Sequence, residues 1–412
     1  MNKLSKRLFV CYIPGLDLRR ITVERAPYIA ELLNTYPWAA LRGYPSPELL
    51  STVMTGQEPH EHGIWQTTLR PRKPQPVFQR VLDRLPDAIT IPAQCIQHQL
   101  FRNCDIPTIP PRRRRRFALS RLKFYGHADT QKLLARLGPI ESLVTALGAE
   151  RCRYVFNDRF NEREQVVHDV ASGGWTLEFL QFHAADILGH WHADTPEKIS
   201  ALYRAIDDFV QRLHEKCQAN GVLMSLCSDH GQEPVTGSID LRRHLTALAV
   251  PDGEYAYFLQ PIAARFWFET DRARQTVTGM LSNVAHGMLL SYRDMHEHGV
   301  RFPDGRNGEW YFLADPGYLF FPHDFYHPLP NLLFGLKDWQ QRRRIRDPRH
   351  IAYHGYLPSH PSERGFVAVL DARCRTDGGT IALTDLAPSW LALAGERAPT
   401  SMRGTARFRG AD

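Results

Sequence analysis

The fold is decided by the stretch "TPEKISALYRAIDDFVQRLHEKCQANGVLMSLCSDHG", residues 195–231. Its first part carries apolar residues at helical spacing, starts with Thr195-Pro196 and stops at Asn220-Gly221, which predicts one long amphipathic helix. The run "GVLMSLC" that follows has the length and composition of a strand buried on both faces. Because a similar run, "WTLEFLQF" at 175–182, precedes the helix, the segment is a strand–helix–strand unit whose two strands should run parallel.

Two further apolar runs extend this pattern. "RLFVCYI" (7–13) lies near the start of the chain and "GFVAVL" (365–370) near its end, and each leads into polar residues. We therefore predict an α/β fold with a central, mostly parallel sheet that helices cover on both faces. Residues 79–145 and 251–345 are rich in Pro, Arg and aromatics and show weak periodicity. We expect them to be inserted loop or cap segments of a single domain spanning 1–412.

The composition excludes several classes of protein. The 412 residues are 43% hydrophobic and 23% charged, which is typical of a globular chain. No apolar run approaches the ~20 residues that a membrane span needs, and the basic start precedes too short an apolar stretch for a secretory signal. We therefore expect no membrane partner. Seven cysteines without CxxC pairing favour reduced thiols and a cytoplasmic location.

The formal charge of +7 is concentrated in arginine runs at Arg112–Arg116 and Arg342–Arg346. Such runs are most often solvated surface, and attraction of an anionic substrate is the alternative. A nucleic-acid-binding role built on these runs is the less favoured interpretation, since it requires a steeply salt-dependent affinity.

Acids and histidines follow the predicted strands. Asp186 and His190 come after the run at 175–182, Asp229 and His230 come after "GVLMSLC", and His354 precedes the run at 365–370. Ligands of open parallel sheets bind beyond the carboxyl ends of the strands, so we expect these side chains to meet at one edge. A lone Asp-His pair is more often a capped turn. Together the five residues favour a two-metal cluster, with Zn²⁺ or Mn²⁺ preferred by mixed Asp and His ligands.

A candidate nucleophile precedes a predicted helix. Ser46 lies directly before Pro47-Glu48, a pattern typical of an ordinary N-cap. The same position also favours a serine alkoxide, because the N-terminus of a helix stabilises negative charge. The local sequence leaves both interpretations open.

Five segments, in order along the chain, resemble the alkaline phosphatase superfamily, most nearly its nucleotide pyrophosphatase/type I phosphodiesterase branch. They are "MTGQEPHEHGI" (54–64), "DILGHWHAD" (186–194), "CSDHGQ" (227–232), "HGYLPSHPSERGFVAV" (354–369) and "LTDLAPSWLALAG" (383–395). The resemblance implies an alkaline phosphatase-like α/β fold with two metal ions beside a Ser or Thr nucleophile.

Mapped onto this chain, the resemblance assigns a role to each candidate. One metal falls to Asp186, His190 and His354, and the other to Asp229 and His230. Counting back from Thr55-Gly56 places Ser46 at the nucleophile position. Thr67, or its neighbour Gln66, falls where the nucleotide-cleaving branch keeps an asparagine that contacts the phosphoryl oxygens.

One position departs from the family pattern. The first strand of the family usually ends in "DG", and its Asp ligates the second metal, whereas this chain has Pro14 there. Proline cannot coordinate a metal. Asp17, one turn further on, is the candidate replacement; without it, Asp229, His230 and Ser46 alone would hold the second metal.

The predicted function is that of a metal-dependent phosphoester hydrolase acting on a small phosphodiester or nucleotide-like substrate through a phosphoserine at Ser46. Other activities of the superfamily stay open: phosphomonoester, phosphonate or sulfate-ester hydrolysis and phosphotransfer. "SPELL" (46–50) lacks the arginine of the sulfatase pattern, which counts against that branch. A catalytically silent binding protein, with the second metal site lost at Pro14, is the alternative outside the enzymes.

Overall fold

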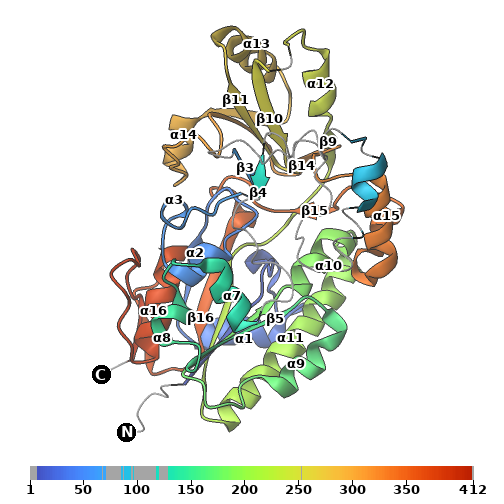
Figure 1. Cartoon of the computed structure of the whole chain (residues 1–412). Helices are drawn as coiled ribbons and strands as arrows, with labels where there is room; N and C mark the ends of the chain where they lie inside the picture. Colours follow the sequence, from blue (N-terminus) through green and yellow to red (C-terminus); the bar gives the residue numbers. More distant parts are fainter. Residues whose placement is uncertain are drawn as a thin grey trace.

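The computed structural model describes residues 7–66, 68–70, 85–86, 88–93, 96, 117–119, 129–251 and 253–410. A seven-stranded sheet forms the centre of the molecule (Figure 1). Its strands, in spatial order, are β18 (Thr380–Ala382), β2 (Trp38–Arg42), β16 (Arg364–Val369), β7 (Leu223–Ser228), β1 (Leu8–Tyr12), β6 (Leu177–Phe182) and β5 (Cys152–Asn157). All neighbours pair in parallel except β16, which is antiparallel to both β7 and β2. The predicted mostly parallel α/β sheet is thus confirmed.

The helix that was predicted from the sequence connects two of these strands. It is α11 (Pro196–Ala219), capped by the Thr195 hydroxyl, which accepts a hydrogen bond from the backbone N–H of Lys198. Gly221 follows the helix with a φ of +62°, a conformation that glycine adopts without strain. The flanking strands β6 and β7 run parallel as predicted, but they are not neighbours, because β1 lies between them and pairs with both.

Successive side chains of β1 enter different cores, as the period of two in a strand requires. Leu8 and Val10 pack in the core beneath α2 (Leu50–Thr55), α7 (Thr130–Leu137), α8 (Leu143–Leu147) and α16 (Leu386–Leu393). Phe9 and Cys11 pack in the core beneath α1 (Pro27–Thr35), α9 (Arg163–Asp169), α10 (Ala184–His192) and α11. Helices therefore cover both faces of the sheet.

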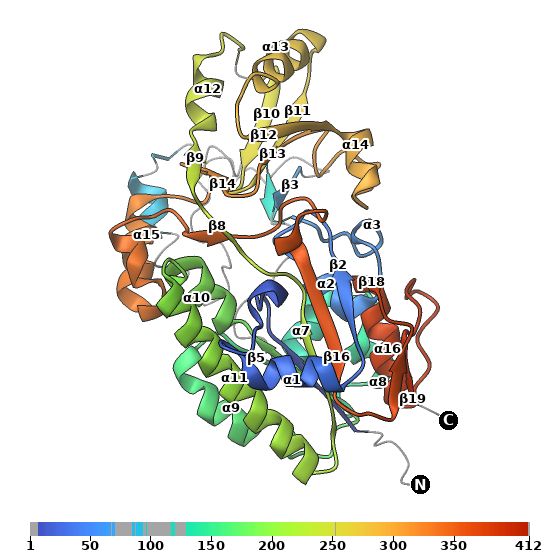
Figure 2. The ribbon, with the colours of Figure 1, turned by 180° about the vertical axis from the view of Figure 1, so that it is seen from behind.

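A second, smaller sheet lies beyond one edge of the main sheet (Figures 1 and 2). Its antiparallel strands are, in spatial order, β10 (Tyr255–Leu259), β11 (Ala263–Phe268), β13 (Trp310–Ala314) and β12 (Gly287–Ser291). It packs with α12 (Leu241–Ala247) and α13 (Asp271–Leu281), and α14 (Tyr292–Glu297) follows β12. We call residues 255–314 the cap. The cap falls inside the segment 251–345 that was expected to be an insertion; most of the other expected insertion, 79–145, lies outside the described residues.

Short elements join the cap to the main body. These are β3 (Thr68–Leu69) with β4 (Ala118–Leu119), β14 (Tyr318–Phe320) with β9 (Gly237–Ile239), and β15 (Ala352–Tyr353) with β8 (Glu233–Pro234). Further elements are the helices α3 (Pro59–His62) and α15 (Pro328–Lys337) and the antiparallel pair β17 (Cys374–Thr376) with β19 (Phe408–Gly410).

Two sequence expectations concern the whole chain. The cysteines that the structure describes are buried and free of disulfide bonds; they are Cys11, Cys152, Cys217, Cys227 and Cys374. Among the described helices, none combines the length and hydropathy that a membrane crossing requires.

A substitution at Gly365 in β16 would test how closely the strands pack at the edge of the sheet. A Cβ at this position would lie 2.2 Å from the carbonyl oxygen of Ser228 and 2.6 Å from that of Asp229. We expect Gly365→Ala to lower the free energy of unfolding by about 2 kcal/mol or more, since backbone atoms cannot yield as side chains do. The matched control is Gly279→Ala in α13, where no atom lies within 4 Å; it should raise stability by up to about 1 kcal/mol. Denaturant unfolding of both variants measures the difference, and equal stabilities would contradict it.

Candidate metal and nucleophile site

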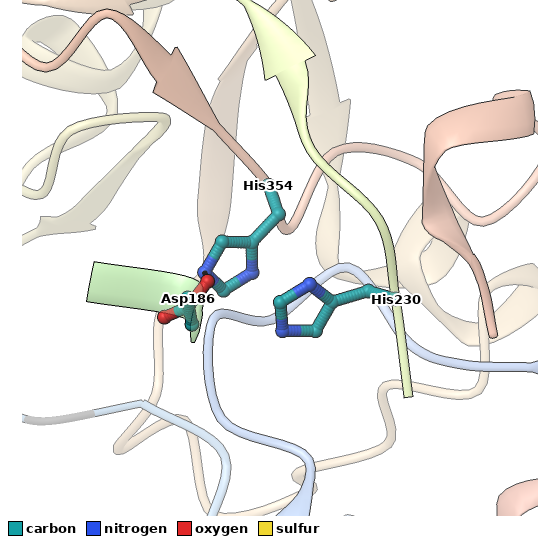
Figure 3. A group of neighbouring side chains, drawn as sticks. All are labelled: Asp186, His230 and His354. Carbon is teal, nitrogen blue, oxygen red and sulfur yellow. Dashed lines mark ion pairs between the residues drawn. The ribbon is translucent and has the colours of Figure 1, made fainter. Parts of the chain in front are cut away.

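The predicted site residues lie at the carboxyl edge of the main sheet. Asp186 stands in the first turn of α10, which follows β6, and His190 stands one turn later. His230 follows the end of β7, and His354 follows β15. Asp186, His230 and His354 are buried, and each offers one ligand atom within 4.8 Å of those of the other two. Figure 3 shows the three side chains pointing toward one another from three different segments.

The distances make Asp186 the centre of the group. Its Oδ2 lies 3.4 Å from His190 Nε2, and its Oδ1 lies 3.7 Å from His354 Nε2. The rings of His230 and His354 are stacked, with centroids 3.6 Å apart and planes 9° apart. Asp229 Oδ1 lies 3.4 Å from His230 Nε2. The structure therefore brings together the acids and histidines that the sequence places far apart.

Backbone carbonyls determine which ring nitrogen of two histidines faces the acids. His190 Nδ1 lies 2.7 Å from the carbonyl oxygen of Ala352, and His230 Nδ1 lies 2.8 Å from that of Gly231. Because a carbonyl only accepts, each Nδ1 carries the proton, and in the neutral ring the Nε2 lone pair faces Asp186 or Asp229. Metal-binding histidines are held in this way.

The donor set fits a divalent metal ion. The buried His354 Nδ1 has no hydrogen-bond partner, and Asp229 Oδ1 accepts no hydrogen bond, so polar atoms at this edge are left for a further ligand. Imidazole nitrogens and carboxylate oxygens are the donors that Zn²⁺ and Mn²⁺ take in proteins.

Electrostatics at the site favour a bound cation. Burial alone would raise the pKa of Asp186, but His190, His354 and His183 beside it hold that pKa well below its usual range. Burial lowers the pKa of His354 well below its usual range, which keeps this imidazole neutral and able to donate a lone pair. Burial also lowers the pKa of His230, yet the nearby carboxylates, Asp229 first, outweigh it and raise that pKa overall. A positive charge beside Asp186 is therefore stabilised.

The candidate replacement for the missing acid is engaged elsewhere. Asp17 accepts hydrogen bonds from Arg19 Nη2 at 2.7 Å and Arg19 Nε at 3.0 Å, and from the backbone N–H of Arg19. The group of three ligands does not include it. The Asp17 side chain packs instead on Gly231, where an added Cβ would lie 2.4 Å from its Cγ, and Pro14 itself carries no side-chain donor.

Ser46 lies beside the same cluster. Gly355, which directly follows His354, packs so closely on it that a Cβ there would lie 3.0 Å from the Ser46 carbonyl carbon. The Ser46 hydroxyl is buried; it donates to the carbonyl oxygen of Trp65 at 2.6 Å and accepts from the backbone N–H of Glu48 at 3.1 Å. The structure starts α2 only at Leu50, so the sequence interpretation of Ser46 as an ordinary cap of a helix beginning at Pro47 is wrong.

Of the two residues predicted to contact the phosphoryl oxygens, Gln66 and Thr67, the structure describes Gln66. Gln66 is fully buried, and neither its Nε2 nor its Oε1 has a hydrogen-bond partner. It directly follows Trp65, whose carbonyl oxygen accepts the hydrogen bond of the Ser46 hydroxyl. Thr67 lies outside the described residues.

A cavity of about 270 Å³ opens at this site. One side is lined by the site residues Asp186, His190 and His354, and the other by the cap residue Gln260 and by Phe325 and Gln341. The cavity can therefore admit a small molecule to the cluster from beneath the cap.

Sequence reasoning missed two site residues. Gln232 Nε2 donates to Asp186 Oδ1 at 2.6 Å and so orients the central carboxylate; its signal was its place at the end of "CSDHGQ". Glu48 lines the cavity, and burial raises its pKa to about 7. Its only signal was proximity to Ser46.

Comparisons with known proteins agree with this geometry. A family model described as type I phosphodiesterase / nucleotide pyrophosphatase matches residues 16–321. The fold is similar to that of murine ectonucleotide pyrophosphatase / phosphodiesterase 5, solved also as an inactive variant in complex with AMP: for that complex the TM-score is 0.62 at 14% identity, with 96% of each chain covered. The human counterpart gives a TM-score of 0.63 at 13% identity, again with 96% of each chain covered.

A comparison with curated protein sequences finds no significant match. The family model nevertheless covers well over half of the chain, including Ser46, Asp186 and the Asp229-His230 pair. The chain belongs to the type I phosphodiesterase / nucleotide pyrophosphatase family.

Proposed function

We propose that this chain is a metal-dependent phosphoester hydrolase that acts on a small phosphodiester or nucleotide-like substrate through Ser46. The main supporting observation is that Ser46 lies close to the Asp186 cluster. Gly355 packs against the Ser46 backbone, and His354, the residue before it, belongs to the cluster. The Asp186 cluster lines a cavity large enough for a phosphoryl group, and Pro47 and Glu48, the two residues after Ser46, line it as well.

The residues would divide the work as follows. Asp186, His190 and His354 would hold a divalent ion, Zn²⁺ before Mn²⁺, which when bound supplies positive charge to the phosphoryl oxygens. Ser46 Oγ attacks phosphorus, the bond to the leaving oxygen breaks, and a phosphoserine forms. Water then attacks this phosphoserine, which releases phosphate monoester and returns the hydroxyl. The Gln66 amide, buried and without a partner, would hold a phosphoryl oxygen through Nε2.

Two observations support a nucleotide-like substrate over a polymer. The cavity is of small-molecule size, and Phe325 offers an aromatic face on its outer wall. The murine structural relative has been solved with AMP. A cytoplasmic location is also proposed, supported by the free cysteines in the described part of the chain.

A catalytically silent binding protein is the second candidate, favoured by the Pro14 departure. It shares the fold and the cavity but predicts that no phosphoester is turned over. The two candidates differ in the outcome of the next experiment.

Replacing the nucleophile gives the direct test. Ser46→Ala should lower kcat for phosphodiester hydrolysis by about 10³-fold or more, because the variant lacks the hydroxyl that would form the covalent intermediate. The control is Ser238→Ala, which changes an exposed serine and should leave kcat unchanged. Full turnover by the Ser46 variant would refute the role of Ser46, and no turnover by the wild-type protein would favour the binding protein.

Substrate preference separates the branches of the superfamily. We expect bis(nitrophenyl) phosphate to be hydrolysed with a kcat/KM at least about tenfold higher than nitrophenyl phosphate, a difference of about 1.4 kcal/mol, and nitrophenyl sulfate to be inert. The reason is that the cavity continues past the cluster toward Phe325, where a second ester group can be bound. Initial rates with the three substrates decide the matter; a faster monoester would identify a phosphatase.

A further inference from the structure

We propose that this chain holds one divalent cation, not the two that the family resemblance implies, and that His230 joins Asp186 and His354 around it. The inference rests on the metal site of the proposed function but concerns its ligands and its number of ions. It is supported by the contacts of Asp229, His230 and Ser46, the residues that the family resemblance assigns to the second metal.

The position of the missing acid has no substitute in the described chain. Pro14 provides no side-chain donor, and the Asp17 carboxylate accepts four hydrogen bonds from Arg19 and lies 3.7 Å from Arg20 Nε. A backbone N–H, that of Gln232, also reaches it at 3.4 Å. Moving Asp17 to a metal would break these hydrogen bonds and its ion pairs with Arg19 and Arg20.

Two other donors assigned to the second metal, Asp229 and Ser46, also take part in hydrogen bonds within the protein. Tyr12, the last residue of β1, donates its hydroxyl proton to Asp229 Oδ2 at 2.5 Å. Ser46 Oγ donates to the carbonyl of Trp65, and its lone pair accepts from the Glu48 N–H. Only Asp229 Oδ1 remains available as an acidic donor. One oxygen is too few for a second ion beside the first, because two cations about 4 Å apart need shared or additional negative charge.

His230 lies within reach of the first set as well as of Asp229, whose Oδ1 is 3.4 Å from its Nε2. Its Nδ1 is held by the carbonyl of Gly231, and its ring is stacked on His354. Together with Asp186 and His354 it forms the one group of possible metal ligands found in the described part of the chain. Figure 3 shows the three side chains, with His230 beside His354. With His190, three imidazoles and one carboxylate would supply the four ligands that zinc commonly takes.

The experiment measures metal, not turnover. Protein purified without chelator is stripped, reloaded with excess Zn²⁺, desalted, and analysed by inductively coupled plasma mass spectrometry, with affinity taken from competition against a chromophoric chelator. We expect one equivalent in the wild-type chain. His230→Ala should weaken Zn²⁺ affinity at least about tenfold, whereas the isosteric Asp229→Asn should keep one equivalent with affinity within about threefold.

Pro14→Asp supplies the converse test, since it restores the acid of the family pattern and should raise the stoichiometry to two. Circular dichroism checks the fold of each variant, and the wild-type count stands without any of them. Two tightly held equivalents in the wild type, none at all, or equal losses in the Asp229 and His230 variants would overturn the inference. Because no step depends on hydrolysis, failure of the Ser46 experiment leaves this result readable, and the reverse also holds.

Discussion

The buried carboxylate of Asp186 is the constraint around which the site is built. An ionised carboxylate removed from water costs several kcal/mol unless charged or hydrogen-bonding partners replace the solvent. Here His190 and His354 approach its two oxygens, and the Gln232 amide donates to Oδ1. Each of these partners comes from a different part of the chain, so the charge can be buried only when the whole edge of the sheet is assembled.

Two glycines make that assembly possible. Gly15 follows β1 with a φ of +74°, and a Cβ there would lie 2.8 Å from Asp186 Oδ1. Gly189, inside α10, leaves room for Gln232, whose Oε1 would lie 1.8 Å from an added Cβ. The segment after β1, α10 and the Gln232 side chain can therefore pack closely around the Asp186 carboxylate.

The cap closes the other side of the site and is anchored to it through a buried arginine. Arg265 of β11 donates to the carbonyl and hydroxyl oxygens of Thr68, two residues after Gln66, and its guanidinium lies over Phe258 and Trp267. Burial lowers its pKa to about 9. The anchor couples the position of the cap to the segment that carries Trp65 and Gln66. The cap and the sheet edge that carries the candidate site are thus physically connected.

The sequence by itself determined the elements with strong local patterns: α11 with its cap and stop, the apolar strands β1, β6 and β7, and the positions of Asp186, His190, Asp229, His230 and His354 at strand ends. Helical periodicity and continuous apolar runs are properties of neighbouring residues, so they can be read without the fold. Only the tertiary structure decided the antiparallel direction of β16, the sheet of the cap, the capture of Asp17 by Arg19 and the turn of His230 toward Asp186. An apolar run is equally buried in either direction, and a carboxylate or an imidazole binds whichever partner the folded chain places nearest, which local sequence does not specify.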